Sequence, residues 1–575
     1  MTTVAVTRGG PQAAVALAAC AAAGTACLVW ALRGRYLQVF LGTNPEKGGG
    51  NGGNGEKERQ GVTLTSLNHL IALTGDSWHS SLQRLAIGQM VIGYFCRCPS
   101  FPAFLINVPL QLKLTNEPGL AAIPSPLPDS LAMLASLRDV DLSANGLSTF
   151  PDALLSVPEL KKLNLSRNKL TRLPQEIRRL SHLEHLDLGR NQLPGVPEEI
   201  GHLTNLLTLN LMCNQLESLP DSIGRLMRVF RLGLKSNRLS ALPSSIGSMA
   251  SLVELYLTDN RLTSLPDSIG CCTNLVKLQA SFNQLYALPD SIGHLSRLEL
   301  LRLAANNIHA LPSSLGLLPR LAWLSLASNP LCPPLPPHHQ GVEDIPFGDL
   351  QLGRKLGDGA SGDVYAAVWH GHKVVFKQFN SETSPDGRAV DEIAMTAAVD
   401  HPHLVQVEAT VEQPHGLVMR RVFGRAMADP PNGESLLRCR WPPTASYSLA
   451  TVVAVGRGLA SALEWMHARG WAHGDVYAHN VLLDDKGYAI LCDYGASFPY
   501  PRHSAIPFES HEVRALALLL QGLCTRLSAP ETTAELQSRE QLERLIETCV
   551  GGTAKERLSF KDVGEQLAVI SRSHV

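Results

Sequence analysis

The sequence of 575 residues predicts a fold in two parts, an α/β solenoid of stacked repeats followed by an α+β domain. Three observations predict it. Asparagine recurs every 23 residues between positions 145 and 329. A proline-rich linker, residues 334–344, follows the last repeat. Beyond the linker come a glycine-rich turn, an apolar strand that ends in lysine, and two acidic motifs.

Each repeat has the pattern L-x-x-L-x-L-x-x-N-x-L, as between Leu183 and Leu193. The L-x-L part predicts a short strand with inward leucines, and the asparagine side chain is expected to close the following turn by bonding backbone groups. One repeat cannot bury its own apolar face, so neighbouring repeats must stack. The pattern identifies residues 124–333 as nine leucine-rich repeats. Their Leu-Pro-x-x-Ile-Gly second halves resemble the plant intracellular class.

The concave strand face is the expected binding surface for a protein partner. Its outward positions are polar with both signs of charge, and a solvated sheet face is the alternative interpretation. Tyr256 and the flanking Trp323 are the candidate aromatic anchors. The outward positions are Asp141, Asn164, Asp187, Asn210, Gly233, Tyr256, Gln279, Arg302 and Ser325.

The most informative segment reads H-G-D-V-Y-A-H-N and runs from His473 to Asn480, with Asp493 thirteen residues after Asn480. Two carboxylates and an amide in this order suit phosphoryl transfer. Asp475 would accept or orient the proton of an attacking hydroxyl. Asn480 and Asp493 would hold the metal ions that neutralise a triphosphate.

A nucleotide-binding part precedes this segment. The pattern G-x-G-x-x-G-x-V, in which missing side chains let backbone N–H groups approach phosphates, begins at Gly357. Lys377 ends an apolar strand, where an ammonium can grip the α- and β-phosphates. Glu392 opens a helical run and is its expected partner, with Asp391 as the adjacent alternative.

These motifs resemble the protein kinase family over residues 345–572, and most closely the tyrosine-kinase-like Ser/Thr kinases, which implies an α+β bilobal protein kinase fold. The resemblance implies an ATP- and Mg²⁺-dependent protein kinase, with Ser/Thr favoured as the acceptor. Its implied catalytic residues are Asp475, Lys377, Glu392 and Asn480, and its implied metal ligands are Asn480 and Asp493. Its implied nucleotide contacts are Gly357, Gly359, Gly362, Val364, Val375, Lys377, Met419 as gatekeeper, and Leu482.

The chain departs from the family pattern at several points. Gly474 stands where many kinases carry Arg, and Tyr477 where Ser/Thr kinases carry Lys. Only nineteen positions separate Asp493 from Glu512, which shortens the segment where a peptide substrate would dock. Two alternatives therefore stay open. One is a weak or inactive pseudokinase that acts as a repeat scaffold. The other is a small-molecule phosphotransferase, against which the complete glycine loop argues.

The formal net charge of −1 gives no sign of a nucleic-acid partner. Twelve scattered cysteines without zinc-site spacing indicate reduced thiols in a cytosolic compartment. Residues 13–32, within an N-terminal segment 1–36, are uncharged and predict a single anchor that leaves both domains on the cytoplasmic side of a membrane. A secretory signal and a targeting peptide are the alternatives. We expect a flexible Gly-rich linker over 37–61 and helices over 62–123.

Overall fold

The computed structural model falls into two compact units, Met1–Leu239 and Ser240–Val575. It describes residues 115, 137–335, 342–358, 362–384, 386–530 and 532–572, and four short strands near the N-terminus. These strands are β1 (Ala31–Leu32), β2 (Arg35–Tyr36), β3 (Val62–Thr65) and β4 (Leu110–Lys113). The expected anchor, apart from its last two residues, and the Gly-rich linker lie outside the described residues. Strands β3 and β4 occur where we expected helices.

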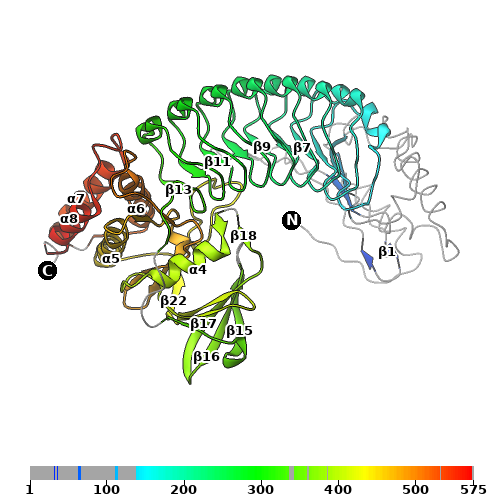
Figure 1. Ribbon diagram of the computed structural model, residues 1–575. Helices are drawn as coiled ribbons and strands as arrows, with labels where there is room; N and C mark the ends of the chain where they lie inside the picture. The colour runs from blue at the N-terminus through cyan, green and yellow to red at the C-terminus, as the bar shows by residue number, and fades with distance from the viewer. Residues whose placement is uncertain are drawn as a thin grey trace, which may run out of the picture. The chain divides into compact units, whose positions relative to one another are not determined.

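The first unit contains a parallel sheet with one strand per repeat. Leu163, Leu186 and Leu209 pair across three successive strands and are completely buried or nearly so. A short 3₁₀ helix returns the chain after each strand (Figure 1). The strands are β5 (Leu137–Asp141), β6 (Lys162–Asn164), β7 (His185–Asp187), β8 (Thr208–Asn210) and β9 (Arg231–Gly233), and the 3₁₀ helices are η4 (Asp152–Ser156), η5 (Gln175–Arg179), η6 (Glu198–His202) and η7 (Asp221–Arg225).

The second unit begins with four further repeats of the same form. Their strands pair in parallel, with Leu255, Leu278 and Leu301 in one inward row. The strands are β10 (Glu254–Tyr256), β11 (Lys277–Gln279), β12 (Leu300–Arg302) and β13 (Trp323–Ser325), and the 3₁₀ helices are η8 (Ser244–Ser248), η9 (Asp267–Cys271), η10 (Asp290–His294) and η11 (Ser313–Leu317). These elements form leucine-rich-repeat turns.

The repeated asparagines close the turns as expected. Asn168 accepts backbone N–H bonds from Asn145 at 2.9 Å and Leu147 at 3.0 Å, and donates to the carbonyls of Leu142 and Leu165 at 2.9 Å. The residue before each repeated asparagine, never a glycine, has a φ between 54° and 61°. This left-handed conformation is costly for residues with a Cβ. The buried asparagine network holds it in place.

A six-stranded sheet forms the smaller lobe of the following domain, in the order β14-β20-β21-β17-β16-β15. Its core packs Val374, Phe376, Ala409 and Val418 between the strands. Helix α4 (Ala389–Ala398) contacts β20. The strands are β14 (Glu343–Asp344), β15 (Gln351–Asp358), β16 (Gly362–Trp369), β17 (His372–Phe379), β20 (Val407–Val411) and β21 (Gly416–Arg420); η12 (Phe347–Asp349) precedes β15, and the pair β18 (Thr383–Ser384) and β19 (Gly387–Arg388) precedes α4.

The larger lobe is mainly helical, around α5 (Leu449–His467). Ser448 caps α5 by accepting the backbone N–H of Thr451 at 3.1 Å. In the described part of the chain, α5 is the one helix long and apolar enough to cross a membrane, but 61% of its apolar window is buried inside the protein. The other elements are α6 (Phe508–Cys524), α7 (Thr533–Val550), α8 (Phe560–Arg572), η13 (Ala478–Asn480), β22 (Gly424–Ala426), β23 (Trp471–Ala472), β24 (Val481–Asp484), β25 (Ala489–Leu491) and β26 (Phe498–Pro499).

Candidate active site

Lys377 and Glu392 form a buried ion pair between β17 and α4. The Lys377 ammonium also lies 3.7 Å from the carboxylate of Asp493. Burial alone would lower the pKa of Lys377, but Asp493 and Glu392 outweigh it and raise the pKa, so this lysine stays charged. The alternative partner, Asp391, instead accepts a bond from Ser328. The structure thus selects Glu392.

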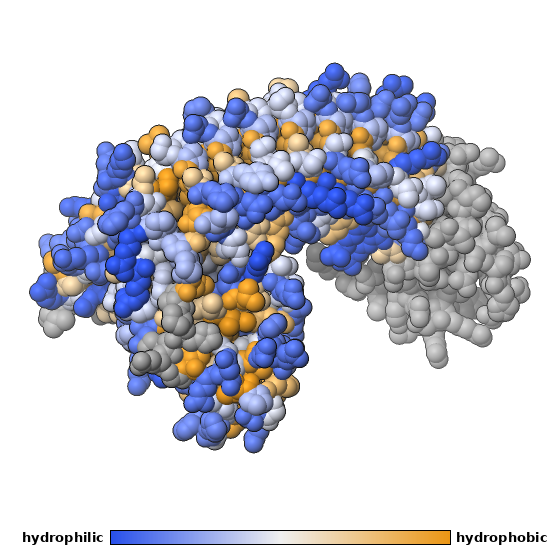
Figure 2. Space-filling view, in the orientation of Figure 1, coloured by the Kyte–Doolittle hydropathy of each residue, from blue (hydrophilic) through white to orange (hydrophobic). Residues whose placement is uncertain are grey.

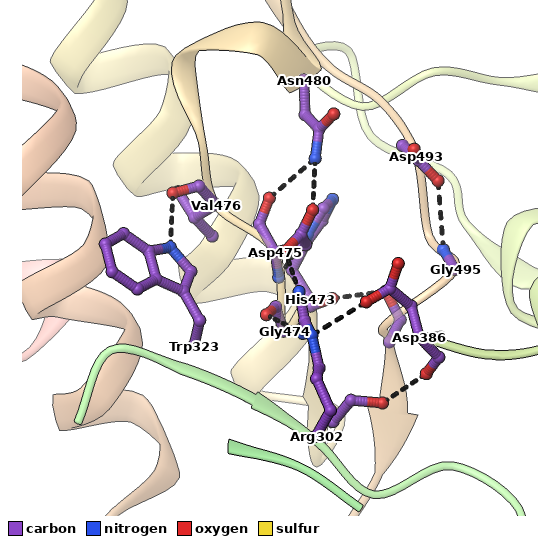
Figure 3. Close-up of polar contacts among 12 residues, drawn as sticks. Arg302, Trp323, Asp386, His473, Gly474, Asp475, Val476, Asn480, Asp493 and Gly495 are labelled. Carbon is purple, nitrogen blue, oxygen red and sulfur yellow. Dashed lines mark hydrogen bonds and ion pairs between the residues drawn. The ribbon is translucent and has the colours of Figure 1, made fainter. Parts of the chain in front are cut away.

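Asp475 and Asn480 are joined within the catalytic-loop segment. The Asn480 amide nitrogen donates to the backbone carbonyl of Asp475 at 3.0 Å and to its carboxylate at 2.8 Å (Figure 3). Further bonds hold the start of the loop, since Ser497 donates to the carbonyl of His473 at 2.9 Å and the Gly474 N–H bonds Glu512. The Asp475 side chain is only 15% exposed.

Asp493 follows β25 with a φ of 67°, which is unusual for a residue with a Cβ and is typical of functional sites. Its carboxylate accepts the backbone N–H of Gly495 at 3.3 Å. Lys377 holds the pKa of Asp493 below its ordinary value, so the carboxylate is ionised at neutral pH.

The donor set of Asn480 and Asp493 fits Mg²⁺, which prefers oxygen ligands. Because the side-chain amide nitrogen of Asn480 is hydrogen-bonded to Asp475, the amide oxygen of Asn480 points away from Asp475 (Figure 3). Among the described residues there is no group of three or more His, Cys, Asp or Glu side chains suited to a metal. A magnesium ion held by Asn480 and Asp493 would therefore complete its shell with water and phosphate oxygens.

A cavity of about 1160 Å³ lies between the two lobes and gathers most of the expected site residues. Gly362 is needed there, because a Cβ at this position would lie 2.1 Å from the carbonyl oxygen of Gln378. Gly359 lies outside the described residues. The expected residues that line the cavity are Gly357, Gly362, Val364, Val375, Lys377, Glu392, Met419, Asn480, Leu482 and Asp493.

Sequence reasoning missed the contribution of the last repeats. Arg302 of β12 donates to the carbonyl of Gly474 at 2.9 Å and to the carboxylate of Asp475 (Figure 3). Trp323 of β13 stacks on Tyr477 at 4.3 Å and donates to the carbonyl of Val476 at 3.1 Å. The expectation that Trp323 anchors a separate partner is therefore wrong, since this side chain is 1% exposed and occupied by the chain itself.

The same contact explains the glycine before Asp475. Gly474 has a φ of 78°, and a Cβ there would lie 2.6 Å from the carbonyl oxygen of Leu324, a residue of β13. Any larger residue would push the repeat strand away from the loop. The spacing motifs of the repeats carry no signal for this contact, because Arg302 and Asp475 are 173 residues apart in the chain.

Comparison with known proteins supports the two-part architecture. Residues 350–514 match the model of the protein kinase domain, and residues 131–193 and 174–286 match models of leucine-rich repeats. The chain therefore carries leucine-rich repeats followed by a protein kinase domain.

Two curated relatives named as protein kinases match part of the chain at modest identity. A RasGEF domain-containing serine/threonine-protein kinase of Dictyostelium discoideum is 28% identical over 158 residues, 27% of this chain and 16% of that protein. A tyrosine-protein kinase of Spongilla lacustris, SRK3, is 27% identical over 150 residues, 25% of this chain and 42% of its own length. A leucine-rich-repeat protein of Leptospira interrogans is 32% identical, covers 40% of this chain and 64% of its own, and has a TM-score of 0.33, too low to bear on the fold.

Proposed function

We propose that the protein is an ATP-dependent protein kinase that transfers the γ-phosphoryl group to a protein hydroxyl, with Ser/Thr favoured. One observation carries the proposal: the Lys377–Glu392 pair, Asn480 and Asp493 line one cavity, and Asn480 holds Asp475. A binding module without chemistry has no need for this set of charges. The chain matches only 16% of the length of the Dictyostelium relative, so activity and substrate are argued from these residues.

In this proposal each residue has a distinct task. Lys377, held by Glu392, binds the α- and β-phosphates. Asp475 orients the acceptor hydroxyl and takes up its proton as the new P–O bond forms, while the bond between the γ-phosphorus and ADP breaks. Bound Mg²⁺, held by Asn480 and Asp493, would neutralise charge on the phosphates. Val375, Met419 and Leu482 line the cavity with apolar side chains suited to the adenine ring of ATP.

The test is transfer of label from γ-labelled ATP with Mg²⁺ by the full chain. Acceptors would be the chain itself, a mixed peptide with Ser, Thr and Tyr, and small alcohols. We expect label on the peptide, with a loss of about 100-fold or more in Asp475→Asn. Phosphoamino acid analysis then separates Ser/Thr from Tyr acceptors.

Other outcomes select the alternatives. Label on the small alcohols alone would indicate a small-molecule phosphotransferase. Absence of label on any acceptor, together with a nucleotide-dependent rise in melting temperature that Lys377→Met abolishes, would indicate a pseudokinase scaffold. Either result would overturn the proposed activity.

We further propose that a protein partner binds the strand face of the repeats in the first unit. Lys162 is exposed there, and His185, Asp187 and Arg231 are half-buried. Figure 2 shows mainly hydrophilic side chains on the visible side of these repeats. Once a binding partner has been identified, the double variant Lys162→Glu, Arg231→Glu should bind it about tenfold or more weakly. The reason is that two charges on the same strand face are reversed. Unchanged affinity would exclude this face.

A further inference from the structure

Arg302 makes an unusual set of contacts for a repeat residue. It ends β12, is 3% exposed, and extends its guanidinium towards the kinase catalytic loop (Figure 3). One terminal nitrogen donates to the carbonyl of Gly474 at 2.9 Å, and the other pairs with the carboxylate of Asp475. The Nε lies 2.8 Å from the carboxylate of Asp386. The Arg302 guanidinium thus connects the catalytic loop, at Gly474 and Asp475, with Asp386 in the segment before α4.

Both oxygens of Asp475 are held by this arrangement. Oδ1 pairs with Arg302 from the repeat domain, and Oδ2 accepts the amide N–H of Asn480 at 2.8 Å from the loop itself. A carboxylate held by two donors from opposite sides has a defined orientation. A planar guanidinium suits this task because its donors lie in a rigid fork.

Within the loop itself, position 477, two residues after Asp475, carries a tyrosine and so supplies no positive charge. Tyr477 is buried, and burial raises its pKa well above the ordinary value, so the phenol stays neutral. Burial would lower the pKa of Arg302, but Asp386 and Asp475 outweigh it and raise the pKa, so its charge is permanent. Arg302 therefore places a fixed positive charge against Asp475.

The contact between repeats and kinase has the character of a shared core. Leu300, Ala322 and Trp323 belong to the same buried cluster as Val476 and Tyr494 of the kinase domain. Separable domain contacts are usually smaller and more polar. A polar rim adds to this core, since Arg438 binds both oxygens of Glu299 at 2.7 and 3.1 Å. Separation of the repeats from the kinase domain would expose this buried core to water. We therefore treat the contact as part of the active conformation.

We propose that Arg302, supplied by the repeat domain, is a positioning residue of the phosphotransfer site that holds the carboxylate of Asp475 towards the acceptor hydroxyl. This inference rests on the kinase function proposed above. The repeat domain then has a second role besides binding partners, because it completes the catalytic loop. The opposite idea, in which Arg302 blocks the site, predicts the opposite sign in the experiment.

The experiment compares the full chain with Arg302→Ala, Arg302→Lys and Arg297→Ala. Arg297 is a matched control, since it lies in the same repeat and its hydrogen bond to Asn274, at 2.8 Å, is exposed. For Arg302→Ala we expect kcat to fall about 10- to 100-fold, since misplacement of a reacting group by about 1 Å can cost that much, with little change in KM for ATP. Arg297→Ala should match the parent.

A purely structural role is separated by rescue. Methylguanidinium added to Arg302→Ala should restore part of kcat, and Arg302→Lys should retain more activity than Arg302→Ala because the charge is kept. If Arg302→Ala fails to fold, the lysine variant carries the test, and a kcat equal to that of the parent overturns the proposal. A kcat for either variant above the parent value also overturns it and indicates a block.

A double-mutant cycle of stability distinguishes failure of this inference from failure of the proposed function. The melting temperatures of Arg302→Ala, Asp475→Asn and the double variant can be measured even if the protein transfers no phosphate. We expect the double variant to lose less than the sum of the two single losses, because both changes break one contact. Additive losses would overturn the inference. A parent protein that transfers no phosphate would overturn the proposed function alone.

Discussion

At the scale of single residues, the site depends on charges that the fold keeps paired. Lys377 is held by Glu392 and lies close to Asp493, so three charges share one small region. Burial raises the pKa of Glu392, and Lys377 opposes that rise. Removal of the lysine lets this carboxyl take up a proton, which limits the cost in stability but leaves no cation for the phosphates.

Lys377→Met should therefore reduce the rate of phosphate transfer about 100-fold or more, while the protein still folds. The measurement is labelled-ATP transfer together with a melting curve in the presence of ATP and Mg²⁺. Lys373→Met is the control, because Lys373 lies on the same strand but is exposed. Full activity in Lys377→Met would contradict the assigned role.

Gly474→Ala tests the close approach of loop and repeat. A Cβ would face the carbonyl oxygens of Ala496 at 2.4 Å and Leu324 at 2.6 Å, in a backbone conformation that favours glycine. We expect a loss of about 2 kcal/mol or more in the free energy of unfolding. Chemical denaturation measures it. Gly348→Ala, where nothing lies within 4 Å of the added carbon, should stay within about 0.5 kcal/mol of the parent.

At the scale of elements, the segment that leads from Asp493 into α6 depends on contacts with the last repeats and with the C-terminal helices. The segment between Asp493 and α6 is short, and Pro507 packs against Gly316 of η11, where an added Cβ would meet it at 3.1 Å. Glu509 at the start of α6 accepts the backbone N–H of Phe560 at 2.9 Å. Arg557 donates to the carbonyls of Pro319 and Ser510. Repeat residues thus support the short segment.

Asn283→Ala should destabilise its repeat strongly. The buried amide donates to the carbonyls of Leu257 at 3.0 Å and Ala280 at 3.1 Å, and accepts the N–H of Leu262 at 3.0 Å. Because these backbone groups would be left buried without partners, we expect a loss of about 2–4 kcal/mol in unfolding free energy. Asn274→Ala removes a half-buried amide whose hydrogen bonds, to the carbonyl of Ala250 and from Arg297, are solvent-exposed, and it should cost about 1 kcal/mol or less. Equal losses would refute the ladder argument.

At the scale of the whole molecule, the last repeats and the kinase domain share one core within the second unit. The folding stability of one part should then depend on the other. Trp323 is the central side chain of this contact, because it is buried, stacks on Tyr477 and donates a hydrogen bond.

Trp323→Ala should cost about 3–5 kcal/mol. Amide exchange should accelerate both in β12 of the repeats and in α5 of the kinase domain, since both lose the same core. Hydrogen-exchange mass spectrometry reads each element separately. Tyr286→Ala removes an aromatic ring that is 59% exposed and should leave both rates unchanged. Faster exchange in β12 alone would show that the two parts fold independently.

Much of this protein follows from the sequence because the relevant signals are local. A 23-residue period predicts stacked strands, and closely spaced motifs predict Lys377, Glu392, Asp475, Asn480 and Asp493 as site residues. The sequence favoured Glu392 as the partner of Lys377 but kept Asp391 as an alternative. Two adjacent acidic residues can be told apart only once the helix fixes the direction of their side chains. The left-handed residues before each asparagine were equally hidden, since they include Arg167, Cys213 and Phe282, which share no side-chain chemistry.

The tertiary structure alone decided what touches the catalytic loop. Arg302 and Trp323 look like ordinary positions of a repeat, and their spacing predicts only a strand face. Their contacts join residues more than 150 positions apart, so no periodic pattern or motif can encode them. Sequence by itself determined the order of repeats and kinase domain and predicted the residues that we propose for the chemistry. Packing between distant segments determined that the repeat domain reaches into the kinase site.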